Sequence, residues 1–235
     1  MNTRTDPESA SASAGVEIAP AVRRHLDDLI DRRPLLASMA DHLVCAFAVL
    51  DRCVRADRTI YLCGNGGSAA DSEHIAAELV KGFESKRPLG PEQRTALEAA
   101  GLAPELIAKM QSPIAAVPLT GFTALRTAVA NDTDPTLEFA QLAYALVREG
   151  DVLVAISTSG ASANVIHAAR AALARGGRVV AMTGERDSEL SGLAEVTLRS
   201  PTTRTLEVQE YHLPMYHTLA LMLETSLFGG AETVS

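Results

Sequence analysis

Two side chains able to act together lie near the end of the stretch CGNGGSAADSEHIAAEL, residues 63–79. They are a histidine and a glutamate four positions apart, His74 and Glu78. In a helix this spacing places both on one face, where an imidazole and a carboxylate could share a metal ion or a substrate. An ordinary exposed pair is the alternative, because glutamate is common on helix surfaces. The pair by itself therefore indicates a candidate site and leaves its use open.

The same stretch begins with a glycine-rich loop, and a second small-residue loop follows about ninety residues later. The first loop reads GNGGS (64–68), and the second supplies four hydroxyl groups, from Ser157, Thr158, Ser159 and Ser162. Each loop precedes a helical run, whose unpaired N–H groups and partial positive charge suit an anion. Turn and capping roles are the alternative for either loop alone. Two such loops, each following a strand-like run, favour a phosphate site.

A nicotinamide-dinucleotide site is the competing interpretation of the first loop, because Gly64, Gly66 and Ala69 fit the G-x-G-x-x-G/A pattern. That pattern requires an acidic residue about 20 positions later, at the end of a second strand. The sequence there is FESKRPLGP (83–91), which is not strand-like. The context therefore excludes the dinucleotide interpretation.

The elements that must position these loops alternate along the chain. Short apolar runs predict strands at 58–63, 114–120, 151–156, 178–184 and 194–200. Helical patterns cover 18–56 (broken at Pro34), the run from the glycine loop to about Val80, a region between 120 and 151, 161–177 and 204–226. This alternation predicts an α/β fold with a parallel sheet covered on both faces and a ligand site beyond the carboxyl ends of its strands. We expect a lead-in at 1–17 without regular structure and one domain over 18–235, with 84–113 as a peripheral insertion.

Composition narrows the possible partners and the compartment. The chain of 235 residues has a net charge of −8, no tryptophan and 4% aromatic residues, which argues against nucleic-acid binding. It has no 18-residue apolar run free of charges and no secretory leader pattern, so we expect no membrane association. Its three cysteines, Cys45, Cys53 and Cys63, form no C-x-x-C pair and predict buried thiols in a reducing cytoplasm.

Three motifs together resemble a known family. CGNGGSAADSEH…AEL, ISTSGASANVI and VQEYHLPMYH, in that order, are similar to the sugar isomerase (SIS) domain superfamily, and most similar to its sedoheptulose 7-phosphate (phosphoheptose) isomerases. The resemblance covers about residues 20–230. It implies a flavodoxin-like three-layer parallel sheet with N-terminal helices, assembled as a homotetramer with sites at subunit interfaces. It also implies aldose–ketose isomerisation of a phosphorylated seven-carbon sugar through an enediol(ate).

The resemblance also implies roles for particular residues. The ligands of one zinc ion per subunit would be His74, Glu78, Gln209 and His217. Glu78 would act as the base and His217 as its acid–base partner. With the hydroxyls of the second loop, the substrate contacts would be Asn65, Gly66, Gly67, Ser68, Asn131, Asp132 and Gln209.

One ligand assignment has a geometric competitor. Gln209 and His217 are eight residues apart, roughly 12 Å along a straight helix at about 1.5 Å per residue. His212 lies only three residues from Gln209, and Pro214 between the two histidines could loosen the helix. The family match favours His217, and His212 stays the alternative.

Three departures from the family leave the exact sugar open. Glu207 and Gly82 stand where many members have arginine, and the segment 84–113 is longer than in compact members. Two other functions therefore compete with the phosphoheptose isomerase. One is a non-catalytic SIS-fold regulator of the kind that binds the bacterial replication initiator, and the other is an isomerase or sensor of another sugar phosphate. The presence of Glu78, Gln209 and His217 favours an enzyme over the regulator.

Overall fold

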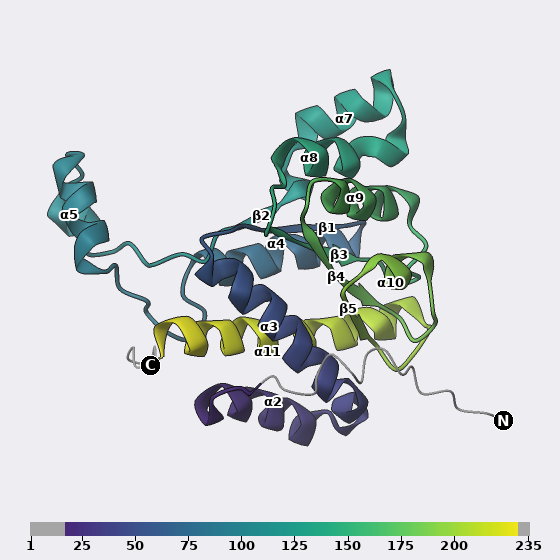
Figure 1. The fold of residues 1–235 in the computed structure, drawn as a ribbon, viewed down its shortest axis with the longest axis horizontal. Coiled ribbons are helices and arrows are strands. Elements are labelled where there is room, and N and C mark those ends of the chain that lie inside the picture. Colours follow the sequence, from purple (N-terminus) through teal and green to yellow (C-terminus); the bar gives the residue numbers. More distant parts are fainter. Residues whose placement is uncertain (1–16, 230–235) are drawn as a thin grey trace.

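The structure, a computed structural model, describes residues 17–229, and a five-stranded sheet forms its centre (Figure 1). The strands are β1 (Ile60–Gly64), β2 (Ala116–Pro118), β3 (Val152–Ile156), β4 (Arg178–Thr183) and β5 (Val196–Arg199). They lie in the order β2-β1-β3-β4-β5, and every neighbouring pair is parallel. The expected flavodoxin-like α/β sheet is confirmed. β2 is shorter than the predicted 114–120, because a 3-10 turn begins directly after Pro118.

Helices connect the strands. In chain order the helical elements are α2 (Pro20–Arg32), η1 (Pro34–Met39), α3 (Ala40–Arg55), α4 (Gly67–Val80), α5 (Pro91–Ala99), α6 (Pro104–Ile107), η2 (Leu119–Gly121), α7 (Thr123–Asp132), η3 (Pro135–Leu137), α8 (Glu138–Leu146), α9 (Ala163–Ala174), α10 (Glu189–Leu193) and α11 (Thr205–Phe228). Pro34 separates α2 from the helix that follows, as predicted. α11 continues through Pro214 as one helix, so this proline does not divide it.

The helices cover the sheet in two layers. α3, α4 and α11 pack on one face, and α8, α9 and α10 pack on the other (Figure 1). Side chains of successive strand residues point to opposite faces of the sheet, so they pack in two separate hydrophobic cores. Leu62 packs in the core on the α11 side and Cys63 in the core on the α9 side. Because both faces are covered, β1 and β3 are buried along their whole length, which explains their continuous apolar runs.

The segment Pro34–Arg55 is long and apolar enough to pass a test for a membrane span by length and composition. Its apolar side chains, among them Leu43, Phe47 and Leu50, belong to the core between α3 and the sheet. Packing inside the domain therefore accounts for its hydropathy. The cysteines behave as predicted, since Cys45, Cys53 and Cys63 are free and buried.

The segment 84–113 leaves the body as an arm, and α5, which packs with α6, stands clear of the sheet and of the helices that cover it (Figure 1). Its base is anchored by a buried ion pair, in which Arg87 Nε donates to Glu224 Oε1 of α11 at 2.6 Å. Arg87 Nη1 and Nη2 donate to the carbonyl oxygens of Leu79 and Glu78. The Glu224 carboxylate in turn accepts backbone N–H groups from Phe83, Glu84 and Ser85. Both buried charges are thus satisfied, and the last turn of α4 is fixed to α11.

Candidate functional site

The two small-residue loops meet at one point of the sheet. Gly64, at the end of β1, pairs with Ile156, at the end of β3, and β1 is the strand from which the sheet order turns in opposite directions. In parallel sheets this switch point opens a crevice for ligands. Asn65 and Asn164 join the loops, because each side-chain amide donates to the other's oxygen, at 2.8 and 2.9 Å.

The first loop depends on two of its glycines. Gly66 has a φ of +55°, a conformation that side chains with a Cβ adopt reluctantly. At Gly67 a Cβ would overlap the side-chain amide of Gln209, so this glycine lets α11 approach the first turn of α4. Asn65, Gly66 and Gly67 are exposed, whereas Ser68 is buried. The loop therefore presents its backbone to the crevice.

The second loop, residues 157–162, presents hydroxyls at the start of α9. The hydroxyls of Ser157 and Ser162 lie 2.9 Å apart, and Ser159 Oγ accepts the N–H of Ala161 at 3.2 Å. Ser162 holds the N-cap position of α9 but makes no side-chain cap bond there. Thr158 is half-buried and Ser159 is exposed. Hydroxyls beside an uncapped helix start form the arrangement expected for a phosphate group.

α4 and α11 bring three of the predicted side chains into one cluster. His74 Nε2 lies 3.2 Å from Glu78 Oε1 and 3.5 Å from His217 Nε2. The Glu78 side chain is 13% exposed and that of His74 41%, so the cluster opens to solvent on the histidine side. Burial lowers the pKa of the His217 imidazole, and the neighbouring His74 adds to this effect. His217 is therefore neutral near pH 7 and able to accept a proton.

The Glu78 carboxylate has unused capacity. Its Oε2 is buried and has no hydrogen-bond partner within residues 17–229, and the nearest cation is the Lys81 ammonium at 3.7 Å. Arg87 donates to the backbone carbonyl of Glu78 at 3.2 Å, which fixes the turn that carries this side chain. The carboxylate is thus held by its backbone while one oxygen remains available to a ligand or a proton.

Other predicted residues lie elsewhere. Gln209 lies against Gly67, and no hydrogen bond joins it to the His74 cluster in the part of the chain that the structure describes. His212 is fully buried, and its Nε2 donates to the carbonyl of Thr183 at 3.2 Å, outside the cluster. The structure therefore places His217, and not His212, beside His74.

Asn131 and Asp132 also lie outside the cluster, at the end of α7. Both are exposed, and the Asn131 amide donates to Asp132 Oδ1 at 2.8 Å. α7 packs on α8 and η3, at the outer edge of the molecule (Figure 1).

A zinc ion is compatible with the donors that do converge. Zinc–ligand distances of about 2.0–2.1 Å in a tetrahedron place neighbouring ligand atoms about 3.3 Å apart. The contacts of 3.2 Å and 3.5 Å around His74 Nε2 are close to that value. Within residues 17–229, no group of three or more His, Cys, Asp or Glu side chains is placed to hold a metal ion by itself. The donor chemistry of His74, Glu78 and His217 suits zinc, and the two contacts around His74 have the spacing of neighbouring ligands. The three side chains do not yet surround one common position, and Gln209 does not join them in this chain.

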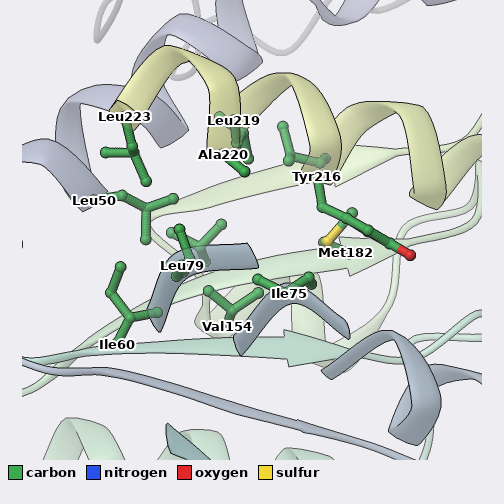
Figure 2. A pocket seen from close by; sticks show the side chains of 12 residues that line it. Leu50, Ile60, Ile75, Leu79, Val154, Met182, Tyr216, Leu219, Ala220 and Leu223 are labelled. Carbon is green, nitrogen blue, oxygen red and sulfur yellow. The ribbon is translucent and has the colours of Figure 1, made fainter. Parts of the chain in front are cut away.

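The nearby void is not the site. Its volume is 20 Å³, and only apolar side chains and the Tyr216 ring line it, among them Leu79, Val154 and Leu219 (Figure 2). The void has no polar group for a sugar phosphate. Figure 2 shows the Tyr216 hydroxyl pointing away from these side chains.

Three residues that contact the site were not predicted from the sequence. Asn164 ties the loops together, Tyr216 contacts His74 Nδ1, and Asp71 accepts a hydrogen bond from Tyr216. Asp71 lies three residues before His74, so helical spacing placed it on the same face and could have identified it. No local pattern marks Tyr216, because its role depends on how α11 packs against α4.

Comparisons with known proteins identify the family of the chain. Residues 126–225 and 31–107 each match a SIS domain family. A phosphoheptose isomerase of Halorhodospira halophila is 35% identical over 207 residues, which cover 87% of this chain and 92% of that protein. One of Aromatoleum aromaticum is 42% identical over 173 residues, covering 72% and 75%. The structure of phosphoheptose isomerase GmhA from Neisseria gonorrhoeae superposes with a TM-score of 0.66 at 33% identity, covering 87% of this chain and 97% of that one.

Proposed function

This chain belongs to the SIS-domain family of phosphoheptose isomerases, and we propose that it interconverts sedoheptulose 7-phosphate and D-glycero-D-manno-heptose 7-phosphate. The observation that carries the proposal is the His74–Glu78–His217 cluster on two helices that also border the phosphate-type loops. A chain that only binds a sugar phosphate has no need of a carboxylate and two imidazoles in contact. The non-catalytic regulator is therefore not favoured.

Binding of the phosphate is assigned to the loop at 157–162. The hydroxyls of Ser157, Thr158, Ser159 and Ser162 would donate to phosphate oxygens, together with the N–H groups at the start of α9. The exposed backbone of Asn65, Gly66 and Gly67, across the crevice, and the nearby Ser68 would contact the sugar chain. These contacts would hold C1 and C2 of the sugar near α4.

Proton transfer is assigned to Glu78 and His217. Glu78 takes a proton from C1 of the ketose and returns it to C2, through an enediol(ate). His217, whose neutral form burial favours, exchanges protons with the oxygens on C1 and C2. The hydrogen bond from Arg87 to the Glu78 backbone keeps the base in place during both transfers.

We assign His74, Glu78 and His217 as holders of a zinc ion, with Gln209 as the fourth ligand from the family resemblance. Bound zinc would polarise the substrate carbonyl and hydroxyl and stabilise negative charge on the enediolate. Glu78 Oε2 is buried without a hydrogen-bond partner among the described residues, with the Lys81 ammonium 3.7 Å away, and this supports a cation at this place.

A homo-oligomer, as a tetramer, would complete the site. Among the described residues, α7 has no buried side chain; Phe122, which precedes it, is 38% exposed and Leu125 within it is 42% exposed. This helix carries Asn131 and Asp132, so packing it against another copy would bury apolar surface and bring these two side chains to a neighbouring site. Three free buried thiols agree with a cytoplasmic location.

The decisive experiment is an isomerisation assay on a panel of sugar phosphates, with and without a chelator. We expect turnover of sedoheptulose 7-phosphate to exceed that of hexose and amino-sugar phosphates, and to fall when zinc is removed. Preference for a six-carbon sugar would assign the chain to another sugar phosphate, and binding without turnover of any panel member would favour the regulator.

A further inference from the structure

The Tyr216 hydroxyl connects two groups of α4. It donates to Asp71 Oδ1 at 3.2 Å, and its oxygen lies 3.0 Å from His74 Nδ1. Tyr216 immediately precedes His217 on α11, and both side chains contact His74. The proposed function uses His74 Nε2 and assigns no role to Nδ1, Tyr216 or Asp71.

Proton counting sets the direction of these bonds. A tyrosine hydroxyl has one proton to donate, and a carboxylate only accepts. A charged acceptor makes the stronger hydrogen bond, so the Tyr216 hydroxyl donates its hydrogen bond to Asp71 and not to His74. The Tyr216 oxygen can then only accept from His74, which requires the proton of the neutral imidazole to be on Nδ1.

The opposite tautomer has its own partner in the structure. With the proton on Nε2, His74 would donate to Glu78 Oε1, which lies 3.2 Å away. That bond would occupy both the imidazole nitrogen and the carboxylate oxygen that the proposed function needs. Removing the acceptor at Nδ1 should therefore let His74 and Glu78 close on each other.

We propose that Tyr216 is a positioning residue, which together with Asp71 holds the His74 proton on Nδ1 and so keeps Nε2 and Glu78 open to a metal ion. This inference rests on the zinc assignment of the proposed function. Asp71 and Tyr216 act on His74 through its Nδ1, the ring nitrogen that does not face the metal site, and neither of them touches the substrate.

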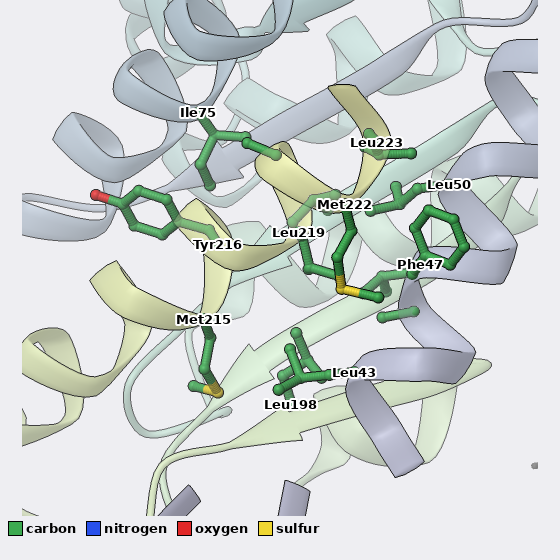
Figure 3. Packing of buried hydrophobic residues seen from close by; sticks show 14 of the residues in the cluster. Leu43, Phe47, Leu50, Ile75, Leu198, Met215, Tyr216, Leu219, Met222 and Leu223 are labelled. Atoms are coloured by element: carbon green, nitrogen blue, oxygen red, sulfur yellow. The ribbon is translucent and has the colours of Figure 1, made fainter. Parts of the chain in front are cut away.

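The Tyr216 ring is held rigidly enough for this role. The residue is 3% exposed and belongs to the apolar cluster that includes Ile75 and Leu219, while its hydroxyl points out of that cluster (Figure 3). It stands edge-on to His74, with ring centroids 5.5 Å apart and planes at 76°. Asp71 Oδ2 is buried without a hydrogen-bond partner in residues 17–229, so the hydrogen bond from Tyr216 to Oδ1 is the one that these residues give to the carboxylate.

The test is Tyr216→Phe, which removes the hydroxyl and keeps the ring. Zinc affinity is measured by competition with a chromophoric chelator, and the His74 tautomer by ¹⁵N NMR of metal-free protein above pH 7. We expect zinc affinity to fall about 10–100-fold, as for losses of groups that orient a metal ligand. We expect the His74 proton to move from Nδ1 to Nε2.

A matched control is Tyr61→Phe. Tyr61 is also a buried tyrosine, and its hydroxyl donates to the Leu146 carbonyl on the other side of the sheet. This variant should keep the zinc affinity and the His74 tautomer of the wild type. Equal affinities in the two variants, with the proton still on Nδ1 in Tyr216→Phe, would overturn the proposal.

Asp71→Ala gives an independent reading if Tyr216→Phe folds poorly. Without the carboxylate, the Tyr216 hydroxyl can donate its hydrogen bond to His74 Nδ1. His74 should then carry its own proton on Nε2, as in Tyr216→Phe, and bind zinc more weakly. An unchanged tautomer in Asp71→Ala would also contradict the proposal. Neither measurement requires turnover, so absence of isomerase activity would count against the proposed function alone.

Discussion

His212 provides a pH-dependent test of the packing beneath the site. It is fully buried on α11, its Nε2 donates to the Thr183 carbonyl, and its Nδ1 has no hydrogen-bond partner within the described residues. Protonation of His212 at Nδ1 would place a positive charge and an N–H group without an acceptor in the protein interior. Burial therefore lowers the pKa of His212 to about 4, with the Thr183 bond opposing the shift.

The lowered pKa fixes the sign of the stability change. At pH values between 6.5, the pKa of His212 in the unfolded chain, and about 4, its pKa in the folded chain, His212 is protonated in the unfolded chain and neutral in the folded chain. The free energy of unfolding is therefore fully retained above pH 6.5 and falls as the pH drops toward 4, at about 1.4 kcal/mol per pH unit. Over this interval His212 contributes a loss of about 3 kcal/mol.

The perturbation is His212→Gln, which cannot titrate. Urea unfolding of both proteins is followed by circular dichroism from pH 4 to 7.5, with chelator present and protein concentration held constant. Other acids titrate in both proteins and cancel in the difference. The stability advantage of the wild type should shrink by about 3 kcal/mol from pH 7 to pH 4. Parallel pH curves would refute the assignment of His212 as a buried neutral histidine.

Two further predictions concern the site. Ser157→Ala and Ser159→Ala should each weaken binding of phosphorylated sugars by about 1–3 kcal/mol in titration calorimetry, since each removes a donor to a charged group. Binding of the unphosphorylated sugar should change little, and equal losses for both ligands would mean that the loop only maintains the fold. His217→Ala should lose zinc in elemental analysis, whereas His212→Ala should keep it, because only His217 contacts His74. The reverse pattern would restore His212 as the ligand.

Much of the fold could be predicted because its signals are local. The wholly apolar run at 152–156 predicted a buried parallel strand, and Pro34 predicted the break between α2 and the next helix. The phosphate-type loops followed from glycine and hydroxyl content at strand ends. The length of β2 was less accessible, because it depends on where the chain turns after Pro118.

The internal arrangement of the site was less predictable from sequence. Spacing placed His74 and Glu78 on one face, and the structure brings them into contact. Spacing could not decide between His212 and His217, because that choice depends on the rotation of α11 against α4. The same packing sets the position of Tyr216 and leaves Gln209 beside Gly67. Contacts between elements distant in sequence have no local pattern to reveal them.

The assignment of Glu78 as the base of a sugar-phosphate isomerase is tested most directly by Glu78→Gln. The substitution keeps the size and hydrogen bonding of the side chain and removes its proton acceptor. Turnover of sedoheptulose 7-phosphate is followed by NMR, with zinc content measured in the same samples. Glu73→Gln, an exposed change on the same helix, is the control. We expect Glu78→Gln to lose at least about 10²-fold in turnover while Glu73→Gln keeps it. Near-wild-type turnover in Glu78→Gln, with zinc unchanged, would contradict the account.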